Sequence, residues 1–429
     1  MNRVFRIRGG APLHGTVAVP GSKNAALAIL SAVLLGQGEF VLHNVPDVSD
    51  IHIKLRLLER FGAKYQWREG TLFLDCTDVH YAEVEEDLVR PIRTSFYILG
   101  SLLARNGRAK LPAPGGCKIG ARPVDLHLKG LELMGATVEL ESGNYVAEVP
   151  KFHGAEIYLD FPSAGATQHL MATACMADGC TVIQNAACEP EIVALANLLI
   201  AMGARIEGAG TTTITISGVE KLGGCTFRIP EDRIQAATYL MAGVITRGKV
   251  TVTGVMPAEQ TALINKLKEA GADCEEGNDW ISAGSTKRLE GIRVKTMPYP
   301  GFPTDMQQPM SAVLALAEGT SVIEETIYES RIGHVSELNR MGAKMSVVNR
   351  ATNIEGVEEL SGANVEASDL RAGAALVLAG LAASGETTIR NIHFIDRGYE
   401  HFEQTLRGLG ADIERLDAET PESVEAELA

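Results

Sequence analysis

One pattern occurs six times along the 429 residues of this chain, and it constrains the fold more than any other feature. Each copy is an amphipathic segment that ends in Gly-Ala and continues into alternating polar and apolar residues. Apolar residues three or four positions apart predict one buried helix face, and a following glycine ends such a helix in the left-handed conformation. The alternation then predicts a half-buried strand. The six pairs begin, 68 to 73 residues apart, at Gly62, Gly135, Gly203, Gly271, Gly342 and Gly410.

A second pattern alternates with the first. Each copy is a helix that is apolar on nearly all sides, followed by a glycine turn and a β-rich strand, and the turn glycines are Gly38, Gly107, Gly179, Gly248, Gly319 and Gly385. A helix that is apolar all round must be enclosed by protein. Units of about 70 residues that mix strands with such helices are longer than ordinary solenoid repeats, so we expect helices enclosed by sheets. The natural division is three units and three units, near 229–230.

The composition excludes several classes of function. With 39 Lys and Arg against 54 Asp and Glu, the net charge is −15, which argues against broad nucleic-acid binding or an anionic membrane surface. The most apolar stretches run to about a dozen residues, whereas a membrane-spanning helix needs about 20. No secretory signal is visible, and the seven cysteines include no CxxC pair. We therefore expect a cytoplasmic protein with reduced thiols and no metal site.

Residues that interrupt the repeat are the candidates for chemistry, and two of them lie in the first half. In PGSKNAAL, Lys23 stands just before a buried helix, where anions are favoured; a solvated lysine in a turn is the alternative. In GGCKIGARPVDLH, Cys117 lies among glycines beside Lys118, and a neighbouring cation lowers the pKa of a thiol. A bystander cysteine remains the alternative there.

The second half adds a carboxylate and three cations. In PGFPTDMQQP, Asp305 stands immediately before a buried helix, which fits either a helix cap or first-turn aspartate, or a general base. Arg331 in SRIGH, Arg371 in SDLRAG and Arg397 in IDRGYE follow. Singly, each arginine would be interpreted as a surface ion pair, but all three occur at junctions between expected elements.

Together these motifs resemble the enolpyruvyl transferase family from end to end, including RIRGG, PGSKNAAL, GGCKIGARPVDLH, PSAGAT, EPEIV, FPTDMQ, SDLRAG and IDRGYE. The resemblance implies an α/β (α+β) fold, a two-domain inside-out α/β barrel of six βαβαββ repeats, three per domain. It places the first domain at residues 22–229 and the second at 1–21 plus 230–429, with the active site in the cleft between them.

The resemblance also implies an activity, since the motifs match the branch of the family that acts on UDP-N-acetylglucosamine. We expect transfer of the enolpyruvyl group of phosphoenolpyruvate to the 3-hydroxyl of the sugar nucleotide, with release of phosphate through a tetrahedral intermediate. This is the first committed step of peptidoglycan precursor synthesis and needs no cofactor or metal. Cys117 matches the proton donor, which fosfomycin alkylates in typical members, and Asp305 matches the general base. Lys23 and Arg397 complete the expected catalytic set.

Binding roles follow from the same resemblance. Expected contacts to phosphoenolpyruvate are Lys23, Asn24, Arg122, Arg331, Arg371 and Arg397. Expected contacts to UDP-N-acetylglucosamine are Asn24, Arg93, Arg122, Pro123, Val124, Asp125, Leu126, Ser163, Ala164, Gly165, Asp305 and Ile327. Three further motif residues, without an assigned role, are Glu189, Arg233 and Asp369.

One departure from the family leaves a second hypothesis open. Phe161 and Pro162 precede Ser163 where many relatives carry a lysine, so enolpyruvyl transfer to a different acceptor is the alternative. A protein that only binds a sugar nucleotide is a third hypothesis. Intact Cys117 and Asp305, together with the five cations, weigh against it.

Overall fold

The computed structural model describes residues 3–115 and 124–417, and these divide into two compact units. The first unit comprises residues 20–115 and 124–232, and the second comprises 3–19 and 233–417. Their boundaries fall within two or three residues of those expected for the two domains. Each unit has its own hydrophobic core.

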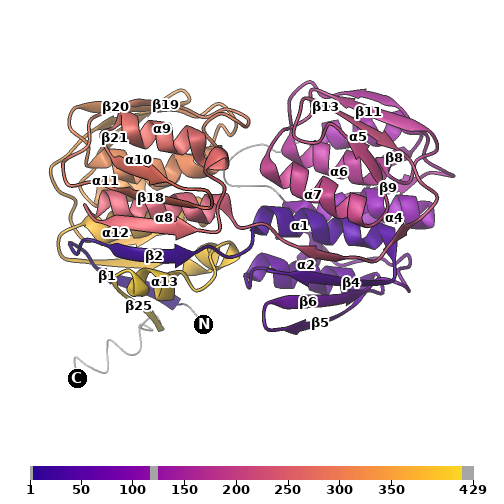
Figure 1. The fold of residues 1–429 in the computed structure, drawn as a ribbon, viewed down its shortest axis with the longest axis horizontal. Helices are drawn as coiled ribbons and strands as arrows, with labels where there is room; N and C mark the ends of the chain where they lie inside the picture. Colours follow the sequence, from indigo (N-terminus) through magenta and orange to yellow (C-terminus); the bar gives the residue numbers. More distant parts are fainter. Residues whose placement is uncertain (1–2, 116–123, 418–429) are drawn as a thin grey trace. The chain divides into compact units, whose positions relative to one another are not determined.

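The second unit contains three four-stranded sheets of one design (Figure 1). In each sheet the first two strands are parallel, and the remaining neighbours are antiparallel. The strands of the first sheet are, in order, β2 (His14–Ala18), β16 (Lys249–Thr253), β18 (Trp280–Gly284) and β17 (Asp273–Glu276). Those of the second are β19 (Arg293–Lys295), β20 (Thr320–Glu324), β22 (Ala351–Glu355) and β21 (Lys344–Val348). Those of the third are β23 (Asn364–Glu366), β24 (Glu386–Arg390), β1 (Arg3–Arg8) and β25 (Asp412–Asp417). The N-terminal strand β1 thus completes the sheet formed by the C-terminal repeat.

Three helices form the interior of this unit, and they are packed against one another. They are α8 (Arg233–Ile245), α10 (Gln307–Ala315) and α12 (Leu370–Ala382). All residues of α8 and α10 are buried, as are Arg371–Leu381 of α12. The other helices have one buried face each, and they are α9 (Thr261–Glu269), α11 (His334–Arg340) and α13 (Phe402–Gly408).

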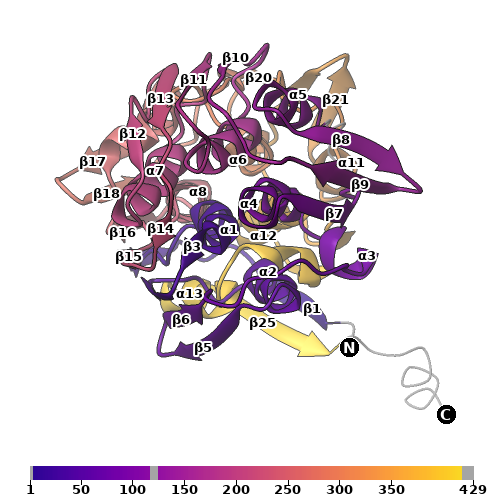
Figure 2. The ribbon, with the colours of Figure 1, turned by 90° about the vertical axis from the view of Figure 1, so that its right-hand side faces the viewer.

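The first unit repeats this design around its own interior helices, as Figure 2 shows. One four-stranded sheet contains β15 (Thr226–Arg228), β4 (Glu39–His43), β6 (Thr71–Asp75) and β5 (Lys64–Arg68), and the other contains β10 (Glu156–Tyr158), β11 (Cys180–Gln184), β13 (Thr213–Ser217) and β12 (Arg205–Glu207). A three-stranded sheet contains β7 (Arg108–Pro112), β9 (Asn144–Glu148) and β8 (Thr137–Glu141). The short strands β14 (Leu222–Gly223) and β3 (Gly36–Gln37) form a pair. The interior helices are α1 (Lys23–Ala32), α4 (Ile98–Asn106) and α6 (Ala164–Ala174). Outside them are α2 (Ser49–Arg60), α3 (Glu86–Val89), α5 (Asp125–Leu133) and α7 (Pro190–Ala201).

The structure confirms the predicted inside-out barrels, because six apolar helices lie inside sheets in two groups of three. It also confirms the helix ends: the six Gly-Ala glycines all have φ between +91° and +110°. Gly248 has a different reason to be glycine. Arg247 takes the positive φ there, at 56°, and a Cβ on Gly248 would lie 1.9 Å from the carbonyl oxygen of Leu13.

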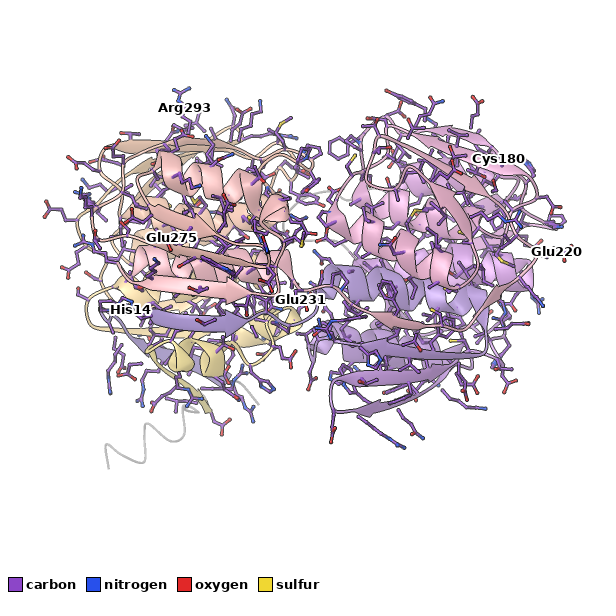
Figure 3. All side chains as sticks on the ribbon, in the orientation of Figure 1. His14, Cys180, Glu220, Glu231, Glu275 and Arg293 are labelled. Carbon is purple, nitrogen blue, oxygen red and sulfur yellow. The ribbon has the colours of Figure 1, made fainter. Side chains whose placement is uncertain are left out.

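Charged side chains cover the outer surfaces of the sheets, among them the labelled Glu275 and Arg293 (Figure 3). No helix among the described residues is both long enough and apolar enough to cross a bilayer.

Candidate active site

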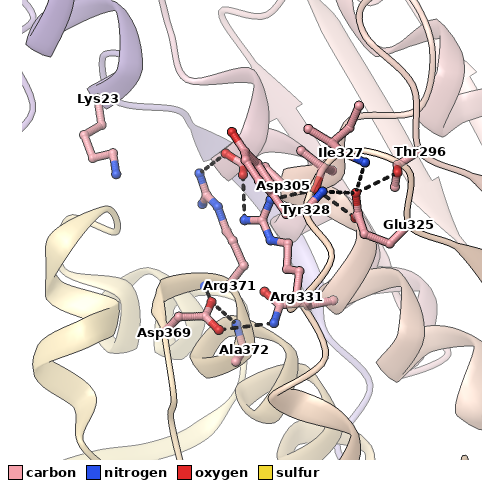
Figure 4. Close-up of polar contacts among 12 residues, drawn as sticks. Lys23, Thr296, Asp305, Glu325, Ile327, Tyr328, Arg331, Asp369, Arg371 and Ala372 are labelled. Atoms are coloured by element: carbon pink, nitrogen blue, oxygen red, sulfur yellow. Dashed lines mark hydrogen bonds and ion pairs between the residues drawn. The ribbon is translucent and has the colours of Figure 1, made fainter. Parts of the chain in front are cut away.

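Asp305 lies in a short 3-10 turn, Thr304–Met306, that leads into α10. Its carboxylate accepts hydrogen bonds from Arg331 Nη2 at 2.7 Å and from Arg371 Nη2 at 3.2 Å (Figure 4). The cap of α10 is Met306, without a side-chain hydrogen bond. Asp305 is therefore not the cap of α10, but it does lie in the first turn of the 3-10 helix, as the first-turn interpretation predicts, and its side chain contacts two arginines.

The two arginines are buried and held by hydroxyl groups. Their side chains are only 4% (Arg331) and 3% (Arg371) exposed, against 25% for Asp305. Arg331 Nη1 donates to the Oγ1 of Thr304 at 2.9 Å, and Arg371 Nη1 donates to the hydroxyl of Tyr399 at 3.1 Å. Nε of Arg331 has no hydrogen-bond partner among the described residues. Guanidinium groups fixed in this way present planar N–H donors that suit a carboxylate or a phosphate.

Asp369 has a structural role beside this pair. One carboxylate oxygen accepts from the backbone N–H groups of Arg371 (2.9 Å) and Ala372 (3.0 Å), which caps α12. The other oxygen accepts from Gln308 Nε2 at 3.2 Å. The predicted helix start at SDLRAG is confirmed, and the cap fixes the residue that carries the Arg371 guanidinium.

Glu325 belongs to the same cluster, although the sequence analysis missed it. Its buried carboxylate accepts from Oγ1 of Thr296 and Thr304 at 2.9 and 2.8 Å. It also accepts from the backbone N–H groups of Ile327 and Tyr328 at 2.8 and 3.1 Å. Glu325 therefore fixes both the turn that carries Ile327 and the hydroxyl that holds Arg331 (Figure 4). A single glutamate directly after strand β20 gives no sequence signal that would have identified it.

Lys23 opens α1 in the first unit. Its side chain is 11% exposed and its Nζ lies 3.4 Å from Oδ2 of Asp50, which is itself buried. Its backbone N–H donates to Asp232, and Ser22 caps the helix by accepting from the N–H of Ala25. The solvated-lysine interpretation is therefore wrong. The adjacent Asn24 is half-buried.

A second cluster of the first unit lies where α5 and α6 begin. Ser163 caps α6 by accepting from the N–H of Ala166 at 3.2 Å. A Cβ on Gly165 would lie 2.7 Å from the hydroxyl of Tyr97, so this glycine allows a close approach. The half-buried Arg93 begins the 3-10 helix that ends at Tyr97. Val124 precedes α5, and its first turn carries the other two predicted contacts, Asp125 and Leu126.

The other predicted residues lie outside the described segments or at the ends of helices. Cys117, Arg122 and Pro123 lie outside the described residues, so their predicted roles remain predictions. Arg397 is half-buried at the end of the 3-10 helix Ile392–Arg397, and Arg233 is buried at the start of α8. Glu189 precedes α7. The described candidates form local groups within each unit.

Known proteins resemble this chain over almost its full length. The family model of EPSP synthase (3-phosphoshikimate 1-carboxyvinyltransferase) matches residues 7–406. UDP-N-acetylglucosamine 1-carboxyvinyltransferase 2 of Carboxydothermus hydrogenoformans is 50% identical over 414 residues, covering 96% of this chain and 99% of the relative. UDP-N-acetylglucosamine 1-carboxyvinyltransferase of Shewanella putrefaciens is 48% identical over 413 residues, covering 96% and 99%.

Solved structures show the same architecture. The enolpyruvyl transferase NikO from Streptomyces tendae superposes with a TM-score of 0.88 at 27% identity, over 97% of this chain and all of that one. An EPSP synthase from Acinetobacter baumannii has a TM-score of 0.76 at 20% identity, over 97% of this chain and all of that one, and shows the fold alone.

Proposed function

Since this chain belongs to the enolpyruvyl transferase family, we propose that it transfers the enolpyruvyl group of phosphoenolpyruvate to the 3-hydroxyl of UDP-N-acetylglucosamine. Phosphate is the second product, and the reaction begins peptidoglycan precursor synthesis. The observation that carries the proposal is Asp305 held between two buried guanidinium groups. The names of relatives that are 48% and 50% identical over nearly their whole length supply the acceptor.

The reaction is an addition followed by an elimination. In the addition, the sugar hydroxyl attacks C2 of phosphoenolpyruvate, Asp305 takes the hydroxyl proton, and Cys117 protonates the methylene carbon. In the elimination, that methyl group returns a proton to the Cys117 thiolate, and the C2–O bond to phosphate breaks with its electron pair leaving on phosphate, which restores the double bond. Asp305 gives its proton to the departing phosphate, so both residues regain their starting states. Positioned acid and base groups and fixed N–H donors lower the barriers of both steps.

The surrounding residues bind the two substrates. Arg331 and Arg371 bind the pyruvyl carboxylate, since two fixed guanidinium groups match its planar geometry. Lys23, Arg122 and Arg397 bind the phosphate group. The sugar nucleotide contacts Asn24, Arg93, Arg122, Pro123, Val124, Asp125, Leu126, Ser163, Ala164, Gly165, Asp305 and Ile327.

The cellular consequences follow from the activity. The enzyme acts in the cytoplasm, where both substrates are made, and cell-wall growth, cell shape and division depend on its product. Fosfomycin inactivates it by alkylating Cys117.

Phosphate release tests the proposal. Purified protein with phosphoenolpyruvate should release phosphate only when UDP-N-acetylglucosamine is added, and Cys117→Ala should lose most turnover. Cys180→Ala is the matched control, because Cys180 is an exposed thiol on β11. Absence of phosphate release at millimolar substrates would overturn the proposal.

A different acceptor is the second candidate, and Phe161 favours it. This side chain is 42% exposed two residues before the cap of α6, and its apolar ring offers no charge to a diphosphate. Shikimate-3-phosphate in place of the sugar nucleotide separates the two candidates. Faster phosphate release with shikimate-3-phosphate would favour the second.

A further inference from the structure

Two buried histidines of the first unit have no role in the proposed reaction. His127 on α5 and His169 on α6 are 7% and 1% exposed. Their Nδ1 atoms lie 3.0 Å apart. The rings of Phe96 and Tyr97 pack against both imidazoles, with centroids 5.5 to 5.9 Å away.

A backbone amide determines where the protons of this pair lie. The N–H of Gly100 donates to Nε2 of His169 at 2.9 Å. A backbone N–H can only donate, so this Nε2 accepts and His169 carries its proton on Nδ1. That proton is donated to Nδ1 of His127, which therefore accepts. His127 must then carry its own proton on Nε2.

Both imidazoles are neutral near pH 7. Burial, together with the charge of Arg93, lowers the pKa of His127 to about 3. Burial also lowers the pKa of His169 well below its usual value, with smaller contributions from His127 and from the buried Lys54. Each ring then has one donor and one acceptor nitrogen, which the chain of hydrogen bonds from Gly100 requires.

The remaining N–H of His127 faces the first turn of α6. A Cβ on Gly165 would lie 3.4 Å from both Cε1 and Nε2 of His127, so this edge of the ring approaches Gly165. Nε2 has no hydrogen-bond partner among the described residues. The first N–H groups of a helix also lack intrahelical partners and favour anions. The N–H donor of a side chain that is 7% exposed, without a partner among the described residues, thus lies beside a helix N-terminus.

We propose that His169 is a positioning residue that holds the proton of His127 on Nε2, so that His127 donates it to a diphosphate oxygen of the sugar nucleotide at the start of α6. This inference rests on the proposed function, which places the nucleotide at Ser163–Gly165. The uncharged donor is useful at this turn because Phe161 brings no cation to it. The opposite tautomer of His127 would present a lone pair to the anion and repel it.

Two substitutions of His169 separate positioning from packing. In His169→Asn the side-chain amide can replace the Nδ1–H donor, whereas His169→Leu removes it. A hydrogen bond worth about 1.4 kcal/mol corresponds to a factor of ten, so His169→Leu should raise the KM for UDP-N-acetylglucosamine about tenfold. The KM for phosphoenolpyruvate should stay unchanged, and His169→Asn should restore most of the affinity. His153→Leu, an exposed histidine of the same unit, is the control and should match the wild type.

Nitrogen-15 NMR measures the tautomer directly, without any substrate. The wild type should show His127 protonated on Nε2 near pH 7, and His169→Leu should show a mixture of tautomers. Calorimetry with UDP and with uridine identifies the oxygen that is bound. His169→Leu should weaken UDP about tenfold and leave uridine unchanged, whereas an equal loss for both would overturn the diphosphate assignment.

His127→Gln and His127→Leu guard against misfolding of the His169 variants. The Gln amide can place a donor where Nε2 lies, so His127→Gln should keep near wild-type affinity while His127→Leu loses about tenfold. A proton on Nδ1 of His127, or a wild-type KM in folded His169→Leu, would overturn the inference. Failure of the proposed function would look different: the wild type would show the tautomer but no nucleotide-dependent phosphate release.

Discussion

Replacement of Asp305 by alanine should destabilise the second unit as well as impair turnover. The substitution removes the carboxylate that pairs with Arg331 and Arg371, whose side chains are 4% and 3% exposed. Removing one partner of a buried ion pair typically costs about 3–5 kcal/mol, because a charge is left without compensation. Asp305 is 25% exposed, so water can approach the vacated place, and we expect a smaller loss of about 2–4 kcal/mol.

A double-mutant cycle isolates the part that comes from the contact with Arg331, at 2.7 Å. At an effective dielectric constant of about 20, unit charges about 4 Å apart attract by about 4 kcal/mol. Solvent on the carboxylate reduces this figure, and measured couplings between contacting residues span about 0.5–3 kcal/mol. We therefore expect a coupling of about 1–3 kcal/mol between Asp305→Ala and Arg331→Met.

Urea unfolding of the wild type, both single variants and the double variant at pH 7 gives this coupling. Lys344 and Glu355 provide the control, since they form a 2.9 Å pair with side chains 62% and 65% exposed. Such exposed pairs contribute about 0.2–1 kcal/mol. A coupling for Asp305 and Arg331 no larger than that of the surface pair would refute the buried ion pair as a stabilising contact.

Three further predictions concern other parts of the chain. Because the pKa of His127 is about 3 in the folded protein and about 6.5 in the unfolded chain, the unfolded chain takes up a proton between these values. The contribution of His127 to stability should therefore fall below pH 6.5, by about 2 kcal/mol at pH 5, and the lowered pKa of His169 adds to the total loss; a His127→Gln variant with the same loss as the wild type in urea unfolding would contradict this. In Cys117→Ala, iodoacetamide should label the exposed Cys180 before Cys175, since burial raises the pKa of Cys175 to about 12. Peptide mass spectrometry reads this out, and early labelling of Cys175 would disprove it. Ser163→Ala should cost about 1 kcal/mol through the lost cap of α6, measured by urea unfolding against Ser163→Asp, which keeps the cap.

The repeat made the interior of each barrel predictable from sequence. Helix periodicity, a glycine at each helix end and alternating strands are local signals, and each is satisfied by neighbouring residues. Sheet membership is different, because strand β1 pairs with β24 and β25, which lie 378 to 414 residues away along the chain. Nothing in the residues Arg3–Arg8 encodes that partner, and only the family resemblance assigns the N-terminal strand to the second domain.

For the site residues too, local sequence signals identified the positions, whereas the contacts between them depend on distant parts of the chain. Asp305, Arg331 and Arg371 were singled out because they stand at junctions before helices, and the structure brings these three together at the starts of α10, α11 and α12. Their pairing could not be derived, since it depends on how three separate helices pack. Glu325 was missed because a single glutamate after a strand has no periodic signature. Only its four hydrogen bonds reveal its role.

The structure also explains how a chain of net charge −15 can be suited to anionic substrates. Three described cations of the site have a carboxylate close by: Asp50 lies beside Lys23, and Asp305 lies between Arg331 and Arg371. The positive charge of these three is therefore partly compensated within the protein. Anion binding must then depend on N–H donors held in fixed directions, as at Nε of Arg331 and at the start of α6. Fixed donors lose little energy to reorganisation when an anion arrives, so specificity here comes from geometry more than from net charge.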